Sequence, residues 1–156
     1  MVTVDSLKRV EILIGLTDEQ LARVAAICET RTLSDQEIIV RENDPSGDIY
    51  IINRGSAEVL LSGGRITAET LAALGPQAII TMGQGQMFGE MSLIDMGPRS
   101  ATVRCTSEGS ELLVISRDAF IRLCEQDTGL GYRVMRNLAA DLSFKLRHRN
   151  LTWTTD

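Results

Sequence analysis

The sequence predicts a mainly β fold in which helices flank the strands at both ends. Three patterns carry this prediction: an amphipathic stretch near the N-terminus, a central series of short β-branched runs separated by turn formers, and an apolar stripe of helical spacing near the C-terminus. With 156 residues, 44% of them hydrophobic, the chain is long enough for one domain but not two. We therefore expect one domain over 1–156, with a helical lead over about 5–30, strands over about 31–116 and helices over about 117–150.

The helical lead is predicted from its capping and periodicity. A short helix is indicated around 7–13, and Thr17 to Gln20 then has the form of a capping box. In such a box the Thr17 hydroxyl accepts from the Gln20 amide while the Gln20 side chain reaches back to the Thr17 amide. Apolar residues at i, i+3, i+4 and i+7 follow on one helical face, namely Leu21, Val24, Ala25 and Cys28.

The first strands are predicted from two β-branched runs, 37–40 and 49–52, which are separated by the turn formers at 43–48. A third run, 57–61, follows Gly55. Because glycine adopts the positive φ that a tight turn needs, we expect 57–61 to pair back on 49–52 as a hairpin.

The later strands are 78–81, 101–105 and 111–115. The last two are expected to form a closing pair around the turn at 107–109. Residues 67–74 have a helix-forming composition and are interpreted as a surface excursion.

Two helices are expected after the strands. Ser116 is a typical N-cap for a helix carrying Phe120, Leu123 and Cys124, and a longer helix should run over about 128–149. The apolar stripe of that longer helix consists of Val134, Met135, Leu138, Leu142 and Leu146.

Composition excludes several classes of function. A net charge of −5 argues against a nucleic-acid-binding surface, and His148 as the single histidine excludes a multi-histidine metal site or a histidine-based catalytic triad. The three cysteines, Cys28, Cys105 and Cys124, are widely spaced and predict neither a disulfide framework nor a zinc cluster. The N-terminus has no signal-peptide pattern and no stretch approaches about 18 apolar residues, so we expect a cytoplasmic protein without a membrane span.

The stretch 88–103, F-G-E-M-S-L-I-D-M-G-P-R-S-A-T-V, carries the chemical information. Gly89 allows close approach to the backbone, and one helical turn over 91–94 would present free amides to an anion. Arg99, placed after Pro98, offers a planar fork that suits phosphate oxygens. The acid Glu90 nearby would suit a ligand that also has a hydroxyl to donate, as a ribose phosphate does.

At these residues the sequence resembles the cyclic nucleotide-binding domain family, which includes bacterial catabolite-activator-type regulators, kinase regulatory subunits and cyclic-nucleotide-gated channels. The stretch 88–103 is similar to the family's phosphate-binding cassette, F-G-E-[LM]-[AS]-L-x(4)-P-R-[AS]-A-T-V, without insertion or deletion. The resemblance spans about 7–149. It implies a double-stranded β-helix, a jelly-roll-like β-roll, between N-terminal helices and a long C-terminal helix. In two places the chain departs from the family: Asn43 stands where glycine is common, and 67–74 is longer than usual.

By this resemblance, Arg99 would bind the exocyclic phosphate oxygens and Glu90 the ribose 2′-hydroxyl. Backbone amides near Ser92 and Ala101 would complete the anion site, which Gly89 and Met91 would line. The predicted ligand-binding residues are therefore Phe88, Gly89, Glu90, Met91, Ser92, Arg99, Ser100 and Ala101.

The resemblance implies a stand-alone sensor that binds cAMP in preference to cGMP and has no catalytic residue, metal or further cofactor. The C-terminal helix would transmit binding to a homodimer seam or to a protein partner, without direct contact to DNA or membrane. Leu142, Lys145 and Leu146 are candidates for contacting the base, and Trp153 for capping it.

Three alternatives remain open at this point. Glu90 and Arg99 could form a structural ion pair. The chain could be the sensory part of a transcription regulator whose DNA-binding domain lies outside it, or an interaction module that keeps the fold without a ligand.

Overall fold

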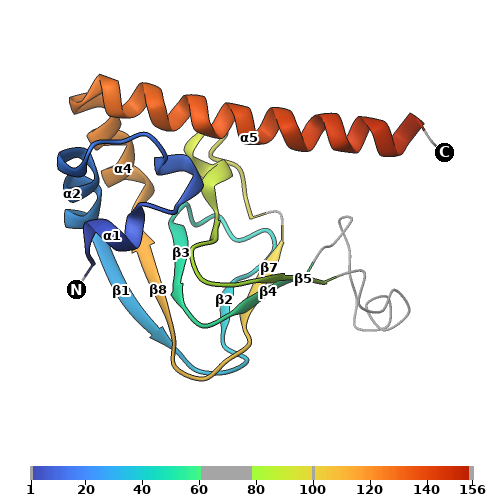
Figure 1. Cartoon of the computed structure of the whole chain (residues 1–156). Helices are drawn as coiled ribbons and strands as arrows, with labels where there is room; N and C mark the ends of the chain where they lie inside the picture. Colours follow the sequence, from blue (N-terminus) through green and yellow to red (C-terminus); the bar gives the residue numbers. More distant parts are fainter. Residues whose placement is uncertain (1, 61–78, 100, 155–156) are drawn as a thin grey trace.

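The computed structural model describes residues 2–60, 79–99 and 101–154 and has strands at its centre with helices around one end and one face (Figure 1). The described strands are β1 (Cys28–Leu33), β2 (Ile38–Val40), β3 (Ile49–Arg54), β4 (Ala57–Leu60), β5 (Ile79–Met82), β6 (Met87–Phe88), β7 (Thr102–Cys105) and β8 (Ser110–Ile115). The described helices are α1 (Val4–Leu7), α2 (Asp18–Ala26), α4 (Arg117–Gln126) and α5 (Thr128–Thr154), with 3-10 turns η1 (Glu11–Leu13) and η3 (Glu90–Leu93).

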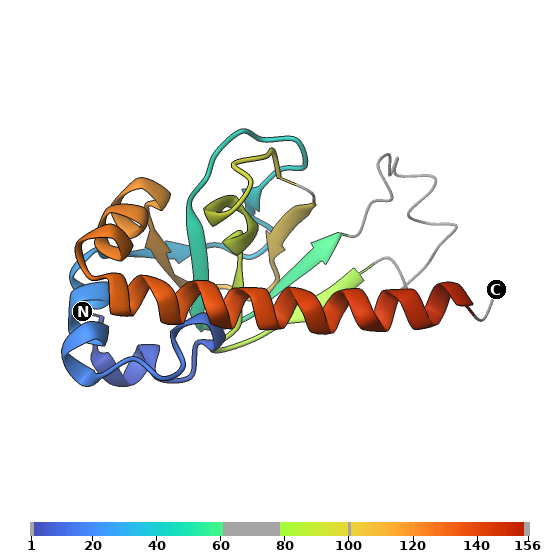
Figure 2. The ribbon, with the colours of Figure 1, turned by 90° about the horizontal axis from the view of Figure 1, so that it is seen from above.

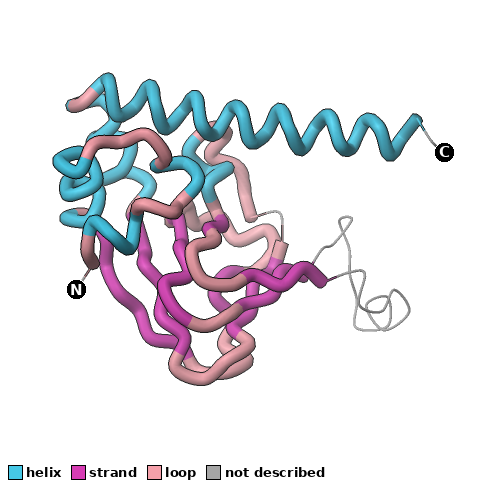
Figure 3. Tube along the Cα trace, viewed as in Figure 1, coloured by secondary structure: helices cyan, strands magenta, loops and turns pink. Residues whose placement is uncertain are grey.

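The strands form two antiparallel four-stranded sheets, in the orders β1-β8-β3-β6 and β2-β7-β4-β5 (Figure 3). Successive strands pass from one sheet to the other at almost every step, which is the pattern of a double-stranded β-helix. The mainly β class with flanking helices and a long C-terminal helix is thereby confirmed.

The core has two parts, which share β3 and β8. Ile49 and Ile51 of β3 pack with the helices, whereas Tyr50 and Ile52 of the same strand face the space between the sheets. Because successive side chains of a strand point to opposite faces, both faces of β3 are buried. This explains why the strand appears in the sequence as a continuous apolar run.

The predicted strand pairings are wrong. The run 49–52 lies in β3, which pairs with β6 and β8, whereas 57–61 contains β4, which pairs with β5 and β7. Gly55 does adopt a positive φ of 97°, but it forms a corner between the sheets instead of a hairpin. Likewise β7 pairs with β2 and β4, and β8 with β1 and β3, so 101–105 and 111–115 do not pair with each other. Turn formers show that the chain changes direction but do not select the partner strand.

The end of the helical lead also differs from the prediction. Helix α2 ends at Ala26, and Cys28, expected on the helical face, is the first residue of β1. The middle of this edge strand, 29–32, is exposed and polar, so it has no apolar alternation that would reveal a strand. The two-residue strand β6 was also missed, and the predicted excursion over 67–74 lies outside the described residues.

Helix α4 begins where capping predicts, and α5 is longer than expected. Ser116 accepts a hydrogen bond from the Ala119 amide at 3.4 Å and caps α4. Along α5, Val134 and Leu138 are fully buried and Leu142 packs against the core, but Leu146 is 60% exposed and does not belong to the buried stripe. Within the described ranges, no helix combines the length and apolar character needed to cross a membrane.

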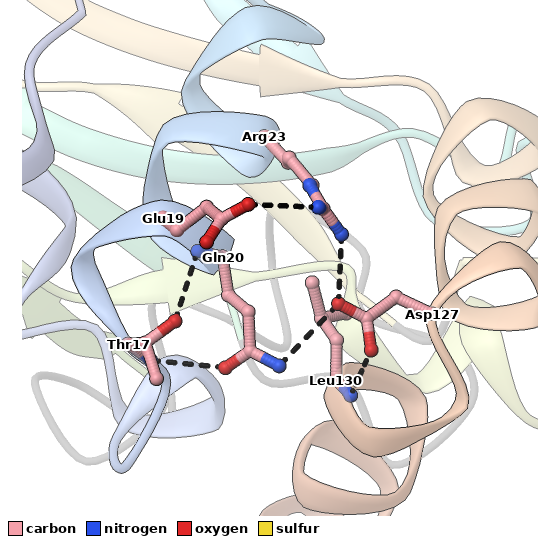
Figure 4. A network of polar contacts seen from close by, with 6 residues as sticks. All are labelled: Thr17, Glu19, Gln20, Arg23, Asp127 and Leu130. Carbon is pink, nitrogen blue, oxygen red and sulfur yellow. Dashed lines mark hydrogen bonds and ion pairs between the residues drawn. The ribbon is translucent and has the colours of Figure 1, made fainter.

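A polar network fixes the beginning of α5 against α2 (Figure 4). Thr17 and Gln20 form the predicted capping box, and the Gln20 side-chain amide also donates to Asp127. Asp127 accepts from the Leu130 amide at 3.0 Å and from Arg23 at 3.0 Å. The Leu130 hydrogen bond is the main reason why the pKa of Asp127 is lowered. From this anchor α5 runs across the full width of the molecule (Figure 2).

We predict that Gly55→Ala destabilises the fold much more than Gly109→Ala. Both glycines have positive φ, but a Cβ at Gly55 would lie 2.1 Å from Ser110 Oγ, whereas a Cβ at Gly109 would meet nothing within 4 Å. Strain alone should cost Gly109→Ala about 1 kcal/mol, and strain with overpacking should cost Gly55→Ala at least about 3 kcal/mol. Urea unfolding of both variants measures the difference, and equal losses would contradict the corner assignment.

Candidate functional site

A cavity of about 1080 Å³ opens on the side of the β-roll that carries η3 and α5. Strand residues supply an apolar wall, whereas η3, the segment around Arg99 and α5 supply polar and charged groups. The apolar wall includes Val40, Ile52, Val59, Met82, Phe88 and Val103.

Arg99 is a buried cation on this cavity, with 7% of its surface exposed. Its guanidinium donates to the backbone carbonyl of Asp48 at 2.6 Å and to the Ser46 hydroxyl at 3.3 Å. It also lies over the ring of Tyr50, 5.6 Å from the ring centroid. All three of these partners are neutral groups, so within the described ranges the guanidinium is held in place without a counter-ion.

The segment that carries Arg99 is fixed to the loop between β2 and β3 by backbone hydrogen bonds. The Arg99 amide donates to the Asp44 carbonyl at 2.9 Å, and the Asn43 amide donates to the Arg99 carbonyl at 2.8 Å. Asn43 has a φ of 70°, a conformation that asparagine tolerates better than most residues, which accounts for its presence where the family often has glycine. The loop 43–48 therefore supports the arginine on both its backbone and its side chain.

Gly89 is required where η3 approaches the arginine. Its φ is 84°, and a Cβ there would lie 2.6 Å from Arg99 Nη1 and 2.8 Å from the Asp48 carbonyl oxygen. Ser92, one turn later, is buried and donates its hydroxyl to the Gly47 carbonyl at 2.7 Å. The serine hydroxyl thus ties η3 to the same supporting loop, and does not itself present a free donor to the cavity.

Glu90 places a carboxylate on the same cavity, with 14% of its side chain exposed. Burial raises the pKa of Glu90, and this effect is opposed by a hydrogen bond from its own amide and by the positive charge of Lys145. The carboxylate can accept a hydrogen bond from a hydroxyl group of a ligand.

The predicted site residues that the structure describes come together. Seven of them line the cavity: Phe88, Gly89, Glu90, Met91, Ser92, Arg99 and Ala101. Ser100 lies outside the described residues. Met91 is 45% exposed, and Phe88 is buried and stacks on Tyr50 with ring centroids 5.0 Å apart.

The alternative of a structural ion pair does not fit this geometry. Among the described residues, Arg99 has no carboxylate within ion-pair distance, and Glu90 has Lys145 as its ion partner at 3.9 Å. Glu90 and Arg99 therefore do not pair with each other, and each can contact a ligand in the cavity separately.

Several residues of the site were not foreseen from the sequence. Ser46 and Asp48 were identified only as turn formers, because the carbonyl of Asp48 can be supplied by any residue type. Tyr50 stands in an apolar run that predicts only a strand, and no sequence pattern singles out Asp141 and Phe144 of α5, which line the cavity. Of the proposed base contacts, Lys145 lines the cavity but Leu142 and Leu146 do not; the Trp153 side chain lies outside the described residues.

The arrangement is suited to a ligand with three parts. An anion fits the buried, un-neutralised guanidinium, a hydroxyl fits the carboxylate of Glu90, and a planar apolar group fits the wall between the sheets.

Comparison with known proteins gives the same family that the cassette indicates. Residues 30–127 match the family model "Cyclic nucleotide-binding domain". The chain is 28% identical over 123 residues to cGMP-dependent protein kinase, isozyme 1, of Drosophila melanogaster, which covers 78% of this chain and 15% of the kinase. It is 31% identical over 139 residues to the Cyclic AMP receptor protein of Thermus thermophilus, which covers 88% of this chain and 57% of the receptor.

A solved structure agrees with these matches. The regulatory domain of Toxoplasma gondii PKA, crystallised with cAMP, superposes with a TM-score of 0.69 at 27% identity, over 90% of this chain and 48% of that chain. The chain spans less than two thirds of each of these three relatives. Because the family model covers more than half of its residues, the chain belongs to the cyclic nucleotide-binding domain family.

Proposed function

We propose that the chain is a regulatory sensor, and not an enzyme, that binds cAMP in preference to cGMP and signals through α5. The observation that carries the proposal is the buried Arg99 guanidinium, which is held only by neutral groups among the described residues and lines the same cavity as Glu90. A buried cation without a counter-ion costs free energy in the empty site, and an anionic ligand offsets that cost.

In this proposal the cyclic phosphate binds at Arg99, and the ribose 2′-hydroxyl donates to Glu90. Phe88, Met91 and the backbone of Gly89, Ser92 and Ala101 surround the sugar phosphate, with Ser100 beside the arginine. The base occupies the apolar wall.

Helix α5 borders the cavity directly, so a bound ligand would contact it. Asp141, Phe144 and Lys145 of this helix line the same cavity, so ligand binding changes their surroundings directly. Ligand should favour the conformation in which α5 closes over the cavity, which is a shift between existing populations. Phe144 and Leu146 are 63% and 60% exposed, so they are available for a homodimer seam or a protein partner in the cytoplasm.

The preference for cAMP is supported by relatives whose names refer to cAMP. These are the Thermus thermophilus receptor and the Toxoplasma gondii regulatory domain, whereas the Drosophila kinase is named for cGMP. A hydroxyl at Ser100 is compatible with either nucleotide.

Titration calorimetry with cAMP and cGMP tests the proposal. We expect saturable binding of both nucleotides, tighter for cAMP, together with a rise in the unfolding temperature because a ligand of the native state stabilises it. No heat and no thermal shift with either nucleotide would contradict the sensor function, and tighter binding of cGMP would contradict the preference.

Replacement of Arg99 should weaken binding. A charge-assisted hydrogen bond to phosphate contributes about 1.5 to 3 kcal/mol, so Arg99→Ala should lose at least roughly tenfold in affinity. Arg99→Lys should recover only part of this loss, because it lacks the planar fork. Arg54→Ala, which removes a cation that is 71% exposed, serves as the control and should bind normally. Unchanged affinity in folded Arg99→Ala would remove Arg99 from the binding site.

A further inference from the structure

Helix α5 places Lys145 next to the buried carboxylate of Glu90. Lys145 Nζ lies 3.9 Å from Glu90 Oε1 and 2.9 Å from Asp141 Oδ2, one turn earlier on the same helix. The hydrogen bond to Asp141 therefore fixes the position of the ammonium group, and the contact with Glu90 crosses from α5 to η3.

The distance to Glu90 matters because it is too long for a hydrogen bond. A carboxylate has about four acceptor positions on its two oxygens. Lys145 contributes its charge at 3.9 Å without occupying one of them. Within the described part of the chain, the carboxylate therefore keeps acceptor positions for a hydroxyl group while a positive charge lies beside it.

The charges around Glu90 act in opposite directions. Asp141 of α5 and Glu11 of η1 disfavour its ionised form, and burial disfavours it more strongly. Lys145 is the cation that favours it, and the pKa of Lys145 is itself raised by the neighbouring carboxylates. Lys145 therefore carries its positive charge across the neutral pH range and favours the carboxylate form of Glu90.

We propose that Lys145 is a positioning residue for ligand recognition, which acts from α5 to keep the Glu90 carboxylate charged and available to the ribose 2′-hydroxyl. The proposal rests on the function proposed above and assigns to α5 a role in selecting the sugar, in addition to signalling. It predicts that removal of the lysine weakens the binding of ligands with a 2′-hydroxyl selectively.

The test compares cAMP with 2′-deoxy-cAMP by calorimetry from pH 5 to pH 8. The wild type should bind cAMP at least about tenfold more tightly than the deoxy ligand, because a hydrogen bond to a charged acceptor is lost. At pH 6 the ratio of the two affinities in Lys145→Met should be about twofold to fivefold smaller than in the wild type, as expected for loss of a partly exposed ion pair. As the pH is lowered, the ratio should also begin to fall at a higher pH in Lys145→Met than in the wild type. Affinity for 2′-deoxy-cAMP should remain unchanged.

Two further variants distinguish the charge effect from a structural effect. Lys145→Arg keeps the positive charge and should restore the ratio. Arg136→Met removes a cation from an exposed position of α5 outside the cavity lining and should leave the ratio unchanged. Equal weakening of both ligands in Lys145→Met would show that the lysine only docks α5, and would overturn the proposal. An unchanged ratio would overturn it as well.

A measurement without ligand separates this proposal from the function on which it rests. NMR titration of the Glu90 carboxyl carbon, assigned with Glu90→Gln, should show a higher pKa in Lys145→Met than in the wild type. An unchanged titration overturns the proposal even if the nucleotides bind. Conversely, if the titration shifts but the wild type binds neither cAMP nor cGMP, the proposed function is wrong and the role in sugar selection is wrong with it.

Discussion

The hydrogen bond from the Arg99 guanidinium to the Asp48 carbonyl is the constraint on which the site depends. The carbonyl is a neutral group, so it holds the buried guanidinium in place and leaves its positive charge available to a ligand. Gly89 must lack a side chain because η3 approaches both partners of this bond, and Ser92 fastens η3 to the neighbouring Gly47. An acidic protein can therefore present a local site for an anion, since the local arrangement outweighs the net charge of −5.

The two-sheet architecture brings these segments together. Strand β3 is buried on both faces, and the loop that precedes it, 43–48, is tied to η3 by Ser92 and to the cavity by the Arg99 side chain. At the other end of the molecule Asp127 joins α2 to the start of α5, which runs from there across the molecule (Figure 2). Residues of α5 line the cavity. The buried residues Val134 and Leu138 and the hydrogen bonds of Asn137 to Ile12 and Ile14 hold the helix between this junction and Lys145.

Local features were predictable from the sequence, and features that depend on distant partners were not. The capping box at Thr17 and the cap at Ser116 follow local rules, and the structure contains both. The site residues of 88–103 are implied by the resemblance to the family, and those that are described line the cavity. The strand pairing around Gly55 failed because a turn former does not specify which sheet receives the next strand. The role of Asp48 was not foreseen because its backbone carbonyl, and not its side chain, makes the contact.

Hydrogen–deuterium exchange with and without saturating cAMP tests the central claim most directly, because it identifies the backbone amides that the bound ligand protects. The account predicts slower exchange in the amides of the η3 turn and of the segment around Arg99, together with the supporting loop 43–48. The edge strand β1, which contributes no residue to the cavity lining, should exchange unchanged. Protection confined to other segments, with these three unaffected at full saturation, would contradict the account.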